Sequence, residues 1–127
     1  MTEPTAPLAP VHSERTEGSG RPLLLVHPIG ASLRFWDDLL PHLGARMPVL
    51  RYDLRGHGQS AVTPGDYRLE QLADDLLDIA DAQGLDRFDL CGVSIGGMVA
   101  LAVAARAPGR VLRLVVSSSA PRVAPPP

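Results

Sequence analysis

Short apolar runs alternate with segments of helical spacing along most of this chain, and this alternation restricts the possible folds more than any other feature. Continuous apolar runs of four to eight residues are typical of strands that are buried on both faces. Four such runs are predicted as strands, at residues 22–27, 48–53, 88–93 and 111–117. Strands that alternate with helices predict an α/β fold, with a mostly parallel sheet flanked by helices.

Three helices are expected between these strands. The first is predicted from apolar residues three or four apart, with Ser32 as its N-cap and Gly44 as its end: Leu33, Trp36, Leu39, Leu40 and Leu43. The second has an apolar face and ends at Gly84: Leu69, Leu72, Leu76 and Ile79. Its acidic residues are expected to lie on a solvated surface. The third follows Ser94, and a short edge strand is expected within residues 11–20.

Three segments with unusual composition follow the ends of predicted strands. They are the loop 28–32, the loop 54–60 and the turn at Ser94. In open parallel sheets, ligands bind at the carboxyl ends of the strands. The sequence therefore predicts that any chemistry is concentrated at one edge of the sheet.

The turn at Ser94 has the pattern G-x-S-x-G, formed by Gly92-Val93-Ser94-Ile95-Gly96. In a nucleophile elbow, a serine stands on a sharp turn between a strand and a helix, and Ser94 has this context. Side chains at Gly92 and Gly96 would crowd such a turn. Two alternatives are a glycine-rich packing turn with an incidental serine and a phosphate-binding turn. The second lacks the spacing and the lysine of a P-loop.

A serine nucleophile also needs two N–H donors for the developing oxyanion. The backbone N–H of Ile95, the residue after the serine, is one candidate. The other is expected from the loop 28–32. Pro28 has no N–H, so Ile29 is the first candidate and Gly30 the next.

The segments LLLVHPIGAS, YDLRGHGQS and CGVSIGGM, in this order, resemble the N-terminal landmarks of the α/β-hydrolases. Within that superfamily, the chain is most similar to the 3-oxoadipate enol-lactone hydrolases of aromatic-acid catabolism. The resemblance implies an ester or lactone hydrolase that uses a Ser/acid/His triad and no metal or organic cofactor. It also implies the N-terminal half of the fold, truncated before the lid and the last strands.

The acid and the histidine of such a triad follow the serine in the chain, yet no Asp, Glu or His follows Asp89. His27 and His57 precede the serine and are expected to brace their loops. The chain is therefore expected to hold the nucleophile and oxyanion groups and to be inactive alone. A non-catalytic binding or interaction module is the alternative. The strand 111–117 would form an apolar edge, open to self-association or to a complementary C-terminal hydrolase segment.

Composition excludes several partners. The net charge is −2, and four scattered arginines after residue 90 make a poor nucleic-acid surface. No apolar stretch is long enough to span a membrane, and the N-terminus has no secretory pattern, so a cytoplasmic protein is expected. The expected domain covers residues 11–120, between a disordered Pro-rich N-terminus at 1–10 and a Pro-rich tail at 121–127.

Overall fold

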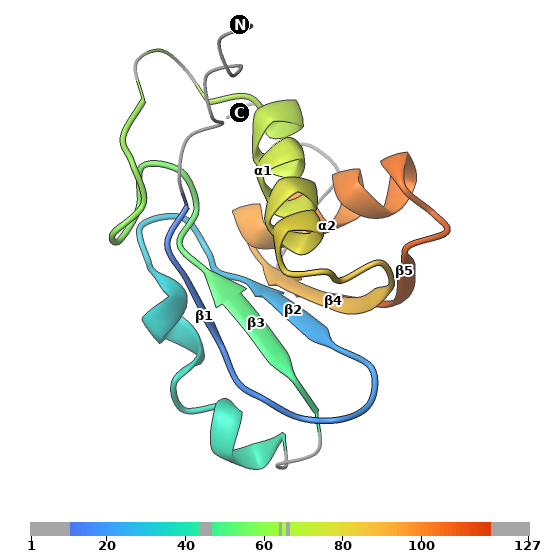
Figure 1. The fold of residues 1–127 in the computed structure, drawn as a ribbon. Coiled ribbons are helices and arrows are strands. Elements are labelled where there is room, and N and C mark those ends of the chain that lie inside the picture. The colour runs from blue at the N-terminus through green and yellow to red at the C-terminus, as the bar shows by residue number, and fades with distance from the viewer. Residues whose placement is uncertain (1–10, 44–46, 64, 66, 118–127) are drawn as a thin grey trace, which may run out of the picture.

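The computed structural model describes residues 11–43, 47–63, 65 and 67–117, which form a layered α/β unit (Figure 1). Its centre is a five-stranded sheet with the order β1-β3-β2-β4-β5. The strands are β1 (Ser13–Arg15), β2 (Leu23–Val26), β3 (Val49–Tyr52), β4 (Phe88–Val93) and β5 (Val111–Ser117). Only β1 is antiparallel to its neighbour, β3; the other pairs are parallel. The predicted α/β class, the four strands and the short edge strand are confirmed.

Two α-helices cover one face of the sheet, α1 (Leu69–Ala82) and α2 (Ile95–Arg106) (Figure 1). The predicted apolar face of α1 packs on the sheet through Leu72, Leu76 and Ile79. Gly84 follows the helix with a φ of +72°, a backbone conformation that favours glycine. Burial of these side chains beside Leu24, Leu50 and Leu90 makes the main core.

The opposite face is covered by two short 3-10 helices, η1 (Leu33–Trp36) and η2 (Leu40–His42). The prediction of one continuous helix from Leu33 to Leu43 is wrong. Pro41 has no N–H to donate to the carbonyl four residues earlier, and its ring clashes with that carbonyl, so an α-helix cannot continue through it. The predicted N-cap is confirmed, because the Ser32 hydroxyl accepts a hydrogen bond from the Arg34 N–H at 3.1 Å. The predicted end at Gly44 lies outside the described residues.

Strand β5 stands at the end of the sheet, and among the described residues it pairs with β4 alone. Three of its apolar side chains are exposed: Leu112, Leu114 and Val115. An exposed apolar edge strand is a template for pairing with another chain. This part of the structure agrees with the edge expected from the sequence.

One acidic residue of α1 departs from the solvated surface predicted for that run. The Asp75 side chain is buried and binds the buried Arg55 guanidinium through two hydrogen bonds of 2.9 and 3.0 Å. The bond to Asp75 is the chief cause that raises the pKa of Arg55. The pair ties the loop after β3 to α1. By contrast, Asp74 pairs with Arg106 at the exposed surface.

The predicted Pro-rich N-terminus at 1–10 and the tail at 121–127 lie outside the described residues, as does the end of the predicted domain at 118–120. Within the described part of the chain, no helix has the length and apolar character needed to cross a membrane.

The two acidic residues give a matched test of the buried pair. We expect Asp75→Ala to lower the free energy of unfolding by about 3–5 kcal/mol, because it leaves the Arg55 charge buried without its partner. Asp74→Ala, in the same helix, removes an exposed pair and should cost about 1 kcal/mol or less. Urea denaturation followed by circular dichroism measures both. Equal losses for the two variants would contradict the role given to Asp75.

Candidate active site

Ser94 occupies the sharp turn between β4 and α2. Its φ is +58° and its ψ is −123°, and it is the one residue other than glycine with a positive φ in the described part of the chain. Such a backbone costs about 1–3 kcal/mol and is found where the surrounding structure imposes it. The turn is held by hydrogen bonds from the Ser94 N–H to the Ser117 carbonyl and from the Gly97 N–H to the Ser94 carbonyl, at 3.0 and 2.9 Å.

The two glycines of the motif leave no room for a side chain. A Cβ on Gly92 would lie 2.2 Å from the carbonyl oxygen of Gly96. A Cβ on Gly96 would lie 2.2 Å from the carbonyl oxygen of Val26, at the end of β2. Both distances are far shorter than any real contact of a Cβ atom. The crowding predicted from the sequence is therefore confirmed, and it brings the first turn of α2 against the end of β2.

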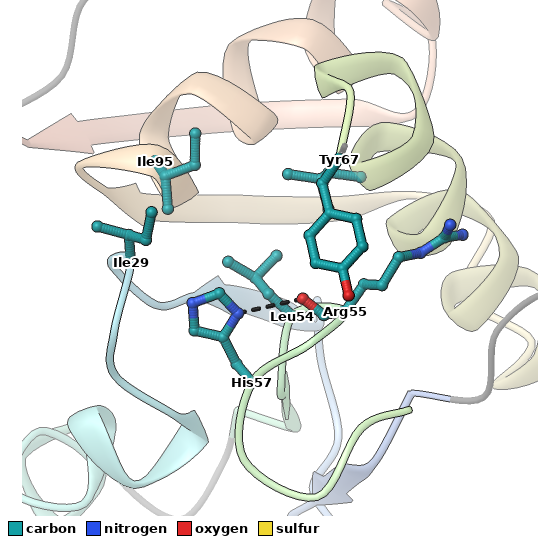
Figure 2. A pocket seen from close by; sticks show the side chains of 7 residues that line it. Ile29, Leu54, Arg55, His57, Tyr67 and Ile95 are labelled. Carbon is teal, nitrogen blue, oxygen red and sulfur yellow. Dashed lines mark hydrogen bonds between the residues drawn. The ribbon is translucent and has the colours of Figure 1, made fainter. Parts of the chain in front are cut away.

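A pocket of about 120 Å³ lies beside this turn (Figure 2). Ile29 and Ile95 lie on one side of it and Tyr67 lies across from them, with His57 near Ile29. The walls are mostly apolar and come from the loops 28–32 and 54–60, from α1 and α2, and from the segment just before α1: Ile29, Leu54, Arg55, His57, Tyr67, Leu72 and Ile95. The two residues predicted as oxyanion donors thus line the same pocket. The Gly30 N–H, the other candidate from that loop, donates to His57 Nε2 at 3.0 Å.

His27 and His57 have both ring nitrogens engaged. His27 is buried; its Nδ1 donates to the Pro28 carbonyl at 2.7 Å, and its Nε2 accepts from the Leu54 N–H at 2.9 Å. Burial is the main cause that lowers the pKa of His27 and keeps the ring neutral. His57 Nδ1 donates to the Arg55 carbonyl at 3.1 Å, and its Nε2 accepts from Gly30. These bonds brace the loops as expected and leave neither histidine with a nitrogen to serve as a base.

Asp53 is a residue that the sequence analysis missed. It is buried at the end of β3, and its carboxylate accepts from the Leu33 N–H at 2.7 Å and from the Gln59 N–H at 2.9 Å. A Cβ on Gly58, which has a φ of +50°, would collide with this carboxylate. Asp53 therefore holds both loops at the carboxyl edge. An Asp at a strand end before a glycine-rich loop is a signal that would have found it.

Arg55 and Tyr67 were also missed, and no local pattern marks either as a pocket residue. The partner of Arg55 is 20 residues away in sequence, on α1. Tyr67 lies against Gly56, where a Cβ would be 2.6 Å from the tyrosine ring. Among the described residues, no group of three or more His, Cys, Asp or Glu side chains is placed to hold a metal ion.

Comparison with known proteins gives a matching family model and similar sequences. A family model described as alpha/beta hydrolase fold matches residues 21–127. RutD of Yersinia enterocolitica, provisionally named a carbamate hydrolase, is 38% identical over 104 residues, which are 81% of this chain and 37% of RutD. The 3-oxoadipate enol-lactonase 2 of Acinetobacter baylyi is 30% identical over 101 residues, 80% of this chain and 38% of that enzyme.

Solved structures of other proteins also resemble this chain. The enol-lactonase from Burkholderia xenovorans LB400 matches with a TM-score of 0.86 and 33% identity, over 90% of this chain and 45% of that protein. The resemblance to enol-lactone hydrolases predicted from the sequence is confirmed at the level of family and fold. The chain spans less than half the length of each of these proteins.

The close contact at Gly96 gives a prediction for the elbow. Gly96→Ala should lower the free energy of unfolding by about 1–3 kcal/mol, because the new methyl group overlaps the Val26 carbonyl. Gly109→Ala is the matched control: nothing lies within 4 Å of its added Cβ. Its effect should stay within about 0.5 kcal/mol. Thermal and urea unfolding measure both, and a Gly96→Ala variant as stable as its control would refute the close contact.

Proposed function

The chain belongs to the α/β hydrolase fold family, and from this premise we propose that it carries the nucleophile and oxyanion groups of a cofactor-free serine hydrolase of esters or lactones. Ser94 is the proposed nucleophile, and the backbone N–H groups of Ile29 and Ile95 are the proposed oxyanion donors. The observation that carries the proposal is the positive-φ turn at Ser94, beside a pocket that both isoleucines line.

In the proposed reaction, Ser94 Oγ attacks the carbonyl carbon and gives up its proton to a base. The negative charge then develops on the former carbonyl oxygen. Ile95 is the first residue of α2, and the first N–H groups of a helix have no acceptor within the helix. Collapse of this intermediate breaks the ester C–O bond, and the leaving oxygen takes a proton. Water then releases the acyl group from Ser94.

Among the described residues, the two histidines at the carboxyl edge of the sheet do not offer a base for this reaction. His27 and His57 are each engaged through both ring nitrogens, and no Asp, Glu or His follows Asp89 in the sequence. Loss of a triad histidine costs on the order of 10⁶ in turnover in subtilisin. We therefore place the acid and the histidine on a polypeptide segment outside these 127 residues. The exposed apolar edge of β5 supports docking of such a segment there.

The proposed substrate is an enol-lactone such as that of 3-oxoadipate. Two similar proteins named enol-lactonases support this choice, one by sequence and one by structure. The pocket would take the apolar part of the molecule next to the scissile bond. Arg55 is the cation in the pocket wall, but Asp75 already neutralises it, so a substrate carboxylate would bind elsewhere.

The alternative function is a non-catalytic α/β-hydrolase-like module that binds or interacts through this scaffold. The missing acid and base favour this alternative. The two functions differ in what they require of Ser94, since binding to a partner would be indifferent to its hydroxyl.

Rescue by an added base tests the proposal. We expect the purified chain to react slowly with p-nitrophenyl acetate, and added imidazole to speed transfer of one acetyl group to Ser94, because a dissolved base then accepts the proton. Mass spectrometry of the Ser94 peptide measures the transfer. Ser94→Ala should show no acetylation of this peptide. The rate at which p-nitrophenyl acetate is hydrolysed in its presence gives the background from imidazole itself. Circular dichroism verifies that both proteins fold.

Two outcomes would overturn parts of this account. Rapid Ser94-dependent turnover of the enol-lactone without imidazole would mean that the chain, alone or self-associated, supplies its own base. A folded chain whose Ser94 stays unacetylated at every imidazole concentration would favour the non-catalytic module.

A further inference from the structure

Both peptide units that flank Ile29 are held by histidine rings. The Pro28 carbonyl accepts a hydrogen bond from His27 Nδ1 at 2.7 Å and another from the Ala31 N–H at 3.2 Å. The carbonyl and the N–H of a trans peptide point in opposite directions. The bonds to the Pro28 carbonyl therefore also fix the direction of the Ile29 N–H, the proposed oxyanion donor.

The second peptide unit, between Ile29 and Gly30, is held by a residue of the loop 54–60. The Gly30 N–H donates to His57 Nε2 at 3.0 Å, across 27 residues of sequence. Gly30 has a φ of +79° and no atom within 4 Å of its added Cβ, so packing around Gly30 does little to hold this unit. The hydrogen bond to His57 and the turn bond from the Ala31 N–H to the Pro28 carbonyl are thus the restraints on the C-terminal side of Ile29.

This restraint requires a neutral His57. Its Nδ1 donates to the Arg55 carbonyl at 3.1 Å, so Nε2 must keep its lone pair to accept the Gly30 N–H. An imidazolium ring has no acceptor, and protonation at Nε2 would set two N–H groups against each other. His27 has the same arrangement, with its Nε2 accepting from Leu54, but it is fully buried, whereas His57 is half-buried at the pocket.

Most groups around His57 are neutral, paired or hydrogen-bonded. The His27 ring, at the end of β2, has its centroid 5.2 Å from that of His57. Arg55 from the same loop is paired with Asp75 of α1, and the Tyr67 hydroxyl is hydrogen-bonded to Thr63. Asp53, at the end of β3, is the remaining charge; its carboxylate accepts from two backbone N–H groups.

We propose that His57 is a positioning residue: its Nε2 holds the Gly30 N–H and, together with the bonds to the Pro28 carbonyl, keeps the segment that carries the Ile29 N–H in the oxyanion geometry. The catalytic consequence rests on the proposed function, whereas the hydrogen bond does not. His57 acts through the backbone of another loop and contacts no reacting atom.

The test follows the Gly30 amide by ¹H–¹⁵N NMR of the labelled chain at about pH 8, where its resonance in the unchanged protein marks the bonded state. His57→Gln places a carbonyl oxygen near the position of Nε2, so Gly30 should remain bonded and its resonance should stay close to that position. His57→Ala removes the acceptor, so the Gly30 resonance should move to the position of the released amide. His42→Gln, in the exposed η2 helix, is the control and should leave the Gly30 resonance unchanged.

An acetylation assay at about pH 8 with added imidazole connects the bond to the proposed function. We expect His57→Ala to acetylate Ser94 about tenfold more slowly and His57→Gln to recover most of the rate, which a general loss of stability would not do. A Gly30 resonance that is the same in the unchanged protein and in His57→Ala would overturn the proposal. If Gly30 responds as expected while Ser94 is never acetylated, the positioning is supported and the hydrolase function fails.

Discussion

The contact between the first turn of α2 and the end of β2 is the constraint on which the site depends. Backbone meets backbone there without an intervening side chain, since a methyl group on Gly96 would overlap the Val26 carbonyl. Interiors packed at this density cannot absorb such an overlap without movement of a main chain. The contact therefore sets the distance from Ser94 and the start of α2 to the loop that carries Ile29. Three neighbouring strands, β3, β2 and β4, then end at one edge, and their loops share one pocket.

The site is built from groups whose charges are absent or already compensated. His57 and Arg55 line the pocket, Arg55 is paired with Asp75, and the Asp53 carboxylate accepts hydrogen bonds from backbone N–H groups. Fixed backbone dipoles, among them the N-terminus of α2, contribute to the field at Ser94. Such dipoles are held by the fold and need no reorganisation when charge develops on a substrate. The proposed chemistry would therefore depend on accurate placement of the loop backbones.

Features that depend on residues close together in sequence were predicted correctly more often than features that depend on distant partners. The strands, α1, α2 and the turn at Ser94 depend on apolar runs, periodic leucines and glycine spacing, which are all local patterns. The helix predicted over 33–43 failed because Pro41 overrules the spacing of the leucines around it. Burial of Asp75 depends on a partner 20 residues away in sequence. The hydrogen bond from the Gly30 N–H to His57 joins residues that are 27 apart. Neither bond leaves a mark in the neighbouring sequence, so only the folded arrangement reveals it.

The backbone of Ser94 has a consequence for how this chain changes over generations. At a φ of +58° every side chain is strained, and glycine is the residue that the turn itself would favour. Stability alone would therefore draw this position toward glycine once its hydroxyl had no use. The nucleophile role proposed for Ser94 would supply the reason for a serine at this place, against the preference of the main chain. In a lineage where the reaction was abandoned, this position would be among the first to drift.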